Sequence, residues 1–132
     1  MSQENVEIVQ SAIDAWNRAD WDAVFKDTAP DFELDMTRAA GPNAGGIYGT
    51  AQARSFVRDF ATSWEAQRIE PHEFIQAGEH VVVPWTNHLR GRGGIAVQTR
   101  VTWVWTIREG AIVRVTYYED RREALEAVGL SE

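Results

Sequence analysis

The sequence predicts an α+β fold in which one curved antiparallel sheet wraps around three N-terminal helices, forming a cone with an internal pocket. Two observations predict this class. Segments with apolar residues at helical spacing occur mainly early in the chain, and segments with alternating apolar residues occur mainly late. Residues 97–120 form two runs of β-branched and aromatic residues around Arg108 to Ala111, which is the pattern of a β-hairpin. A bent sheet covered by helices tends to enclose a cavity.

Helical spacing predicts two helices within residues 3–28 and a third over residues 51–66. Asp20 is the expected N-cap of the second helix, because its side chain can accept a hydrogen bond from the first free backbone N–H groups. Pro30 is expected to prevent the second helix from continuing. The apolar stripes that support these helices are Val6, Val9, Ile13 and Trp16, then Trp21, Val24 and Phe25, then Ala53, Val57, Phe60 and Trp64.

Alternation predicts strands over residues 32–37, 69–77 and 80–90, in addition to the two arms of the hairpin at 97–120. In the first strand Phe32, Leu34 and Met36 share one face, and Asp35 lies on the other. Pro71 indicates an edge strand or a bulge. Gly110 is free to adopt a positive φ at the last turn. Asp120 is expected to cap a short C-terminal helix, with Glu123 completing a capping box. The strand at 80–90 presents Val81, Val83, Trp85, Asn87 and Leu89 on one face.

The composition is that of one soluble domain spanning residues 1–132, with 44% hydrophobic and 25% charged residues. A net charge of −7 argues against nucleic acid or an anionic membrane as a partner. The absence of cysteine excludes disulfides and thiolate chemistry, and no His, Asp or Glu cluster has metal-ligand spacing. Neither a signal peptide nor a membrane-spanning run is visible, so a cytoplasmic location is expected.

Four segments resemble the nuclear transport factor 2-like superfamily, and within it the SnoaL-like branch that includes polyketide cyclases and relatives of ketosteroid isomerase. The resemblance covers nearly the whole chain and is carried by four motifs in order. They are AWNRADW at residues 15–21, GIYG at 46–49, VWTIREGAIV at 104–113 and DRREAL at 120–125. The resemblance implies a curved sheet wrapped around helices. It implies no particular activity, because this fold hosts enzymes, binding modules and assembly domains.

Asp35 is the candidate general base, because it falls where the isomerase-like members of the family place their catalytic carboxylate. In an apolar pocket its pKa would be raised and it could move a proton next to a carbonyl group. The alternative is a structural Asp at a strand edge, solvated or bonded to loop amides. The family's tyrosine and carboxylic acid oxyanion partners have no counterpart, since the corresponding positions fall near Ala12 and Trp103. His88 is the second candidate, as a partner for Asp35, with a surface or interface position as its alternative.

Eight aromatic residues are candidates for ligand binding. They fill the inward stripes, and two interpretations remain open: ordinary core packing, or the wall of a pocket for a flat, mostly apolar ligand. Tyr48 is expected near the mouth of such a pocket because it lies beside a glycine-rich loop. The eight residues are Trp16, Phe25, Tyr48, Phe60, Trp64, Trp103, Trp105 and Tyr117.

The functional hypothesis is a pocket protein for a small apolar or aromatic ligand. If it is catalytic, it is a cofactor-free isomerase, cyclase or lyase that acts by proton transfer on a hydrophobic cyclic or polyketide-like substrate. The alternative is a non-catalytic ligand-binding or dimerisation module. The hairpin at 97–120 carries no charge in the middle of either face, so both faces are expected to be covered. One would meet the helices and the other a second subunit, which predicts a homodimer through the outer sheet face.

Overall fold

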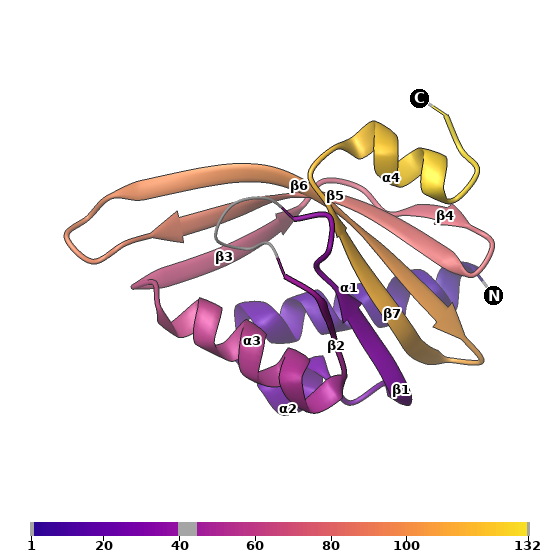
Figure 1. The fold of residues 1–132 in the computed structure, drawn as a ribbon, viewed down its shortest axis with the longest axis horizontal. Coiled ribbons are helices and arrows are strands. Elements are labelled where there is room, and N and C mark those ends of the chain that lie inside the picture. The colour runs from indigo at the N-terminus through magenta and orange to yellow at the C-terminus, as the bar shows by residue number, and fades with distance from the viewer. Residues whose placement is uncertain (1, 40–44, 132) are drawn as a thin grey trace.

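The structure is a computed structural model that describes residues 2–39 and 45–131. It confirms the α+β class, with helices packed on a curved sheet (Figure 1). The elements in chain order are α1 (Ser2–Asn17), α2 (Trp21–Val24), β1 (Thr28–Asp35), β2 (Ile47–Tyr48), α3 (Thr50–Thr62), β3 (Ala66–Pro71), β4 (Ile75–Ala77), β5 (His80–Arg90), β6 (Ala96–Arg108), β7 (Ala111–Tyr118) and α4 (Arg121–Ala127).

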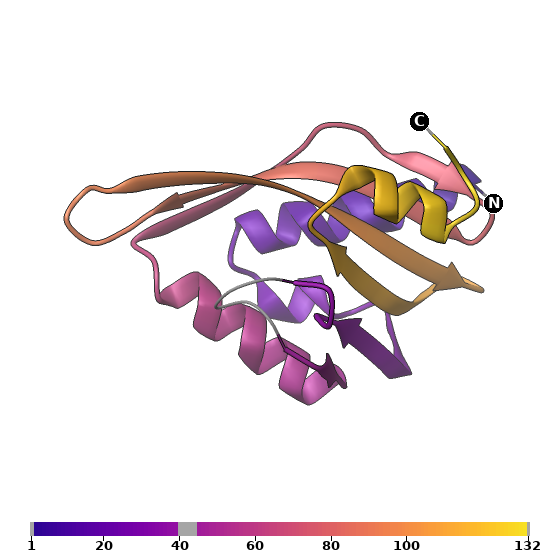
Figure 2. The same cartoon turned by 45° about the horizontal axis from the view of Figure 1, so that its top comes forward.

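The sheet has the strand order β2-β1-β7-β6-β5-β3, with β4 also paired to β5. It is mixed and not entirely antiparallel as predicted, because β1 runs parallel to β7 with Leu34 opposite Val115. Local alternation could not reveal this pairing, since it joins an early strand to the last one. The other pairs are antiparallel. The sheet curves strongly and stays open, so that β3 and the long β5–β6 hairpin extend away from the body (Figure 2).

Proline positions explain two differences from the predicted boundaries. Pro30 lies inside β1, at the irregular stretch where the register with β7 shifts between Thr28 and Glu33. A bulge of this kind tolerates the missing N–H group. Pro71 ends β3, so the predicted strand at 69–77 is divided into β3 and β4. Asp20 caps the short α2 as predicted, by accepting a hydrogen bond from the Ala23 N–H group at 3.2 Å.

The concave face of the sheet packs on α1, α2 and α3, and the main core lies between these layers (Figures 1 and 2). Val9 and Ile13 are the fully buried part of the α1 stripe, and Ala53 and Val57 are the buried part of α3. The strands contribute Phe32, Leu34, Val81, Val83, Trp85, Val101, Trp103, Trp105, Ile107, Ile112, Val115 and Tyr117 to the same core. No helix in the described part of the chain is long and apolar enough to cross a membrane.

The outer face of the sheet carries a second apolar cluster, which α4 covers. Val82, Val104 and Tyr118 from three strands pack with Ala124 and Leu125 of α4. Asp120 caps α4 as predicted, by accepting a hydrogen bond from the Arg122 N–H group at 2.9 Å. The chain itself therefore covers a part of the face that the sequence predicts to meet a second subunit. The homodimer stays a prediction.

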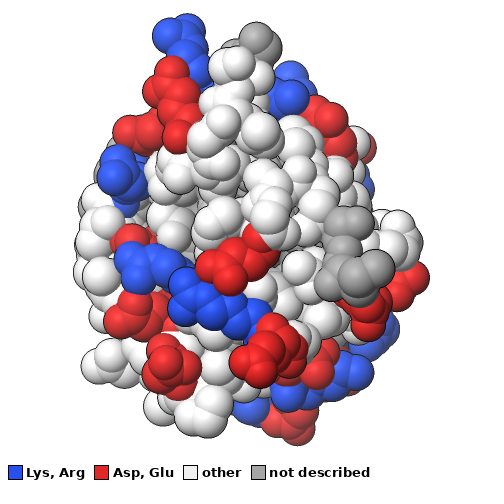
Figure 3. Space-filling model, turned by 90° about the vertical axis from the view of Figure 1, so that its right-hand side faces the viewer, with Lys and Arg blue, Asp and Glu red and all other residues white. Residues whose placement is uncertain are grey.

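The turn between β6 and β7 has the backbone that the sequence predicts. Gly110 has a φ of 79°, and Glu109 before it has a φ of 51°. Two successive positive φ values are those of a tight hairpin turn. On the side of the molecule in Figure 3, basic and acidic side chains lie next to one another instead of forming a patch of one sign. Arg108 contributes to this kind of pairing, because its Nε is 3.0 Å from a carboxylate oxygen of Glu79.

Candidate functional site

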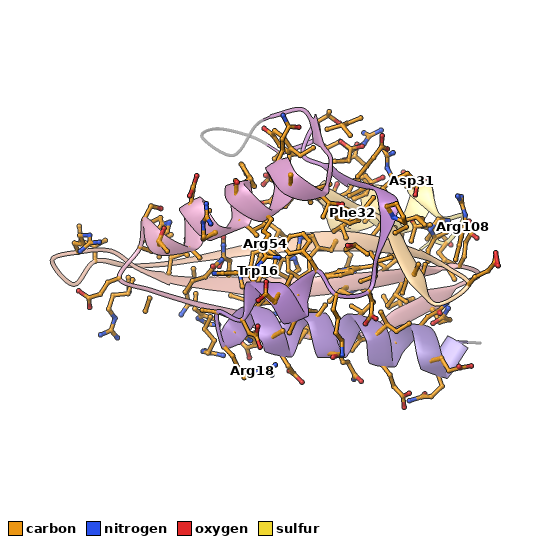
Figure 4. All side chains as sticks on the ribbon, turned by 90° about the horizontal axis from the view of Figure 1, so that it is seen from below. Trp16, Arg18, Asp31, Phe32, Arg54 and Arg108 are labelled. Atoms are coloured by element: carbon orange, nitrogen blue, oxygen red, sulfur yellow. The ribbon has the colours of Figure 1, made fainter. Side chains whose placement is uncertain are left out.

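The candidate site is an apolar cavity between the concave face of the sheet and the three helices. Its volume is about 70 Å³. Figure 4 views the helical side, where Trp16 and Phe32 lie in the region between α3 and the α1–α2 pair. The lining residues are Trp16, Val24, Phe25, Thr28, Phe32, Leu34, Met36, Phe56, Val57, Phe60, Gln67, Trp85, Asn87, Trp103, Trp105, Ile112, Val115 and Tyr117.

Three neighbouring elements place a cluster of tryptophans in the wall of the cavity. Trp103 is at its centre, with ring centroids 4.1 Å from Trp85, 5.6 Å from Trp16 and 5.5 Å from Trp105. Trp103 and Trp105 share a face because they are two residues apart on β6, and Trp85 lies on the neighbouring strand β5. The ring of Trp105 is nearly perpendicular to that of Trp103, at 84°. This part of the wall is therefore aromatic and closely packed.

Six of the eight predicted ligand-binding residues line this cavity, and two lie behind it. Trp16, Phe25, Phe60, Trp103, Trp105 and Tyr117 are in the lining. Tyr48 instead stacks on the lining residue Phe56, with 5.2 Å between ring centroids. Trp64 packs against Phe60 at 6.4 Å. These positions make both residues supports of the wall, and their contact with a ligand stays a prediction.

Sequence reasoning missed the polar part of the lining. Asn87 is on the predicted inward stripe of β5, where it is the one polar residue between valine, tryptophan and leucine. That interruption of an apolar stripe was a usable signal. Gln67 on β3 gave no comparable signal, because its role depends on pairing with β5, opposite Leu89. The Trp16 indole donates to Gln67 Oε1 at 3.1 Å, and Gln67 Nε2 donates to Asn87 Oδ1 at 3.1 Å.

Asp35 lies at the end of β1, on the other side of the strand from the lining residues Leu34 and Met36, and it is not in the lining. Its carboxylate accepts hydrogen bonds from the Thr37 N–H group at 2.9 Å and the Thr37 hydroxyl at 2.6 Å, and Arg114 Nη2 lies 2.6 Å from Oδ2. Burial alone would raise the pKa of Asp35, but these contacts from Thr37 and Arg114 outweigh it and hold the pKa below the usual value. The expected raised pKa is therefore wrong, and a catalytic role for Asp35 stays a prediction.

His88 and Asp35 are not brought together. His88 is on β5 and Asp35 on β1, and the strands β6 and β7 lie between them. The ring Nε2 of His88 is 2.7 Å from a carboxylate oxygen of Glu70 on the edge strand β3. That hydrogen bond is the main reason why the pKa of Glu70 is lowered. His88 is outside the lining, so its place in a reaction stays untested.

The cavity offers little acid or base of its own. Tyr117 is the one lining side chain, among the described residues, that can ionise. Burial, and then the neighbouring Glu119 carboxylate, raise the pKa of Tyr117 well above its usual value, so its hydroxyl stays protonated. Within residues 2–39 and 45–131, no group of three His, Asp or Glu side chains is placed to hold a metal ion.

Comparison with known proteins agrees with this architecture. The family model described as SnoaL-like domain matches residues 9–115. TerC, which was co-crystallised with polyporic acid, is 24% identical over 95% of this chain and 97% of its own, with a TM-score of 0.77. An NTF2-like protein from Burkholderia thailandensis E264 is 27% identical over 89% of this chain and 91% of its own, with a TM-score of 0.76. A "putative polyketide cyclase" from Xanthomonas campestris pv. campestris is 24% identical over 97% of this chain and 98% of its own, with a TM-score of 0.72. No curated protein matches the chain.

Proposed function

We propose, starting from the fact that the chain belongs to the SnoaL-like domain family, that its cavity binds a small, flat and largely apolar organic molecule. The observation that carries this proposal is the wall itself. Trp16, Trp85, Trp103 and Trp105 line one hollow together with phenylalanine and aliphatic side chains. Aromatic walls with few polar groups are typical of sites for such ligands, because burial of apolar surface supplies the affinity and the polar groups fix the orientation.

A fold neighbour supports a ligand of this kind. TerC, with the same fold, was co-crystallised with polyporic acid. The cavity has a volume of about 70 Å³ and is therefore small. It favours a small molecule that lies against the tryptophan rings, and a larger one would require the wall to move.

Binding without proton transfer is the function that the lining favours, because its only ionisable side chain in the described part of the chain, Tyr117, has a raised pKa. The second candidate is a cofactor-free isomerase, cyclase or lyase, and it is supported by the Xanthomonas campestris neighbour. Asp35 would then have to part from Arg114 and reach the ligand. Replacing Asp35 by Asn removes its basicity, so turnover of a true substrate would be lost if Asp35 is the base and retained if it is not.

The binding proposal is tested by filling the cavity. Val57 is buried in α3 and lines the hollow, so Val57→Phe adds a ring to the site without removing a polar group. The small flat ketone 1-indanone serves as the first probe, with isothermal titration calorimetry as the assay. We expect the affinity to fall about tenfold or more, equivalent to roughly 1.4 kcal/mol. The matched control is Ile95→Ser, at a residue 68% exposed in the β5–β6 turn, which should bind like the wild type.

Thermal unfolding of both variants establishes that each is folded before binding is compared. Equal affinity of Val57→Phe and wild type would place the ligand elsewhere and contradict the proposal. Failure of 1-indanone to bind the wild type leads to a screen of flat aromatic compounds by thermal shift. A screen in which no such compound raises the unfolding temperature would reject the cavity as a ligand site.

A further inference from the structure

The polar side chains of the cavity form a chain of hydrogen bonds whose direction is fixed at one end. An indole N–H group can only donate, so the Trp16 indole requires an acceptor, and Gln67 Oε1 lies 3.1 Å away. Gln67 must then turn its amide nitrogen to the other side, where Nε2 donates to Asn87 Oδ1 at 3.1 Å. The orientation of both amides therefore follows from the chemistry of Trp16, and a flip of either would place two donors or two acceptors against each other.

This chain of hydrogen bonds ends at the side-chain amide NH₂ group of Asn87. With Asn87 Oδ1 occupied by Gln67, the remaining polar group of Asn87 is Nδ2, which has two N–H bonds and accepts nothing. Asn87 lines the cavity and is only 7% exposed, and Nδ2 donates no hydrogen bond to the described residues. Nδ2 is not one of the fully enclosed unpaired atoms among the described residues, so it keeps some accessible surface, and an acceptor oxygen of a ligand in the cavity can receive its hydrogen bond.

Two further donors belong to the same wall. The indole nitrogens of Trp85 and Trp105 are buried and have no hydrogen-bond partner among the described residues. Both residues line the cavity. Their nitrogens are enclosed, so a ligand would reach them only if the rings rotated. The unpaired polar groups of Asn87, Trp85 and Trp105 are thus all donors.

We infer that Asn87 is a specificity residue of the pocket, held by Trp16 through Gln67, and that it selects a neutral ligand with an acceptor oxygen such as a ketone. This inference rests on the proposed function and names the class of ligand. Among the described residues, the lining contains no Arg, Lys or His for an anion and no Asp or Glu for a cation. A hydrocarbon of the same shape would leave the Asn87 donor unpaired.

The test compares two small flat probes, 1-indanone and indane, which share a ring system and differ by one carbonyl group. Calorimetry gives the dissociation constant of each probe for the wild type and for Asn87→Leu. The carbonyl group also loses hydration on binding, and this loss affects the wild type and the variant alike. We therefore take the dissociation constant of indane divided by that of indanone for each protein, and compare the wild-type ratio with the ratio for the variant. We expect a factor of about three to ten, since one neutral hydrogen bond contributes roughly 0.5–1.5 kcal/mol.

A second variant tests the role of Trp16 as a positioning residue. Trp16→Phe removes the donor that fixes Gln67, so both amides can invert and the preference for indanone should weaken. The readout specific to this role is the pair of side-chain amide signals of Asn87 in ¹⁵N NMR spectra. Both probes bring an aromatic ring next to Asn87, so the readout is the difference between them: indanone should move the amide proton signals further downfield than indane in the wild type, and this difference should diminish in Trp16→Phe. Ile95→Ser is the control and should keep the wild-type ratio.

The outcomes separate the inference from the function on which it rests. The role of Asn87 would be overturned, and an apolar pocket left, if the wild-type ratio divided by that of Asn87→Leu were near one, or if indane and indanone shifted the wild-type Asn87 amide signals equally. Absence of binding by both probes to the wild type would overturn the role of Asn87 and would count against the proposed function as well. The NMR shift in the wild type decides the question even if Asn87→Leu does not fold.

Discussion

Replacing Asp35 by Asn should destabilise the protein. The Asp35 side chain is buried and accepts two hydrogen bonds from Thr37, which an amide oxygen can still accept. The variant instead places an amide N–H group against Arg114, where Oδ2 now lies 2.6 Å from the guanidinium group. The lost contact is thus one charge-assisted hydrogen bond, with a typical value of about 1.5–3 kcal/mol.

The solvent exposure of Arg114 reduces the energy that this hydrogen bond is expected to contribute. The Arg114 side chain is 37% exposed and also pairs with Glu33 at 2.5 Å, so it keeps a carboxylate partner and water. Solvent screening weakens a pair of this kind. We therefore expect Asp35→Asn to lower the free energy of unfolding by about 1–2 kcal/mol at pH 7. Urea denaturation, followed by tryptophan fluorescence, measures the free energy of unfolding of both proteins. Equal m-values would show that the same unfolding transition is compared.

The same pair predicts a pH dependence with a definite sign. The folded-state pKa of Asp35 lies below its usual value. Its stabilising contribution is therefore complete above the unfolded-state pKa of about 3.9 and disappears as the pH falls through the lower folded-state pKa. The stability difference between wild type and Asp35→Asn should therefore stay constant from pH 7 to about pH 5 and shrink as the pH falls further towards pH 3. A variant as stable as wild type at pH 7, or a difference that stays constant down to pH 3, would refute this interpretation.

Two further predictions concern the outer face of the sheet. Leu125→Ala, at a residue 3% exposed in the cluster beneath α4, should cost about 2–4 kcal/mol in thermal or urea unfolding, whereas Leu130→Ala at a half-buried position should cost less. Equal effects would show that α4 does not anchor on that face. The carboxyl of Glu70 should titrate below its usual pKa in the wild type, as followed by ¹³C NMR, and its pKa should rise in His88→Ala because the hydrogen bond is removed. An unchanged Glu70 titration would exclude that bond in solution.

Much of the fold was predictable because it follows from local patterns. The helical stripe that contains Val9 and Ile13 and the positive φ of Gly110 were both expected and are both observed. The resemblance to the SnoaL-like branch is confirmed by the family match over residues 9–115. The parallel pairing of β1 with β7 was not predictable, because no local signal states which distant strand lies beside which.

The candidate site was predicted in its walls and missed in its polar part. Large aromatic residues on inward stripes become cavity walls in a curved sheet, and Trp103 and Trp105 follow that rule. Alternation along β1 places Asp35 on the face opposite Phe32 and Leu34, whereas the resemblance to isomerases predicts that Asp35 is a base facing the pocket. The hydrogen bond between Gln67 and Asn87 joins two strands and exists only because β3 pairs with β5.

The six tryptophans allow a direct test of the pocket by ¹H–¹⁵N NMR of their indole N–H groups during titration with a bound flat ligand. Trp16, Trp85, Trp103 and Trp105 line the cavity, whereas Trp64 lies outside the lining. We expect the four lining signals to shift on one common binding curve while the Trp64 signal stays in place. A titration in which Trp64 shifts and the four lining signals do not would contradict the assignment of this cavity as the binding site.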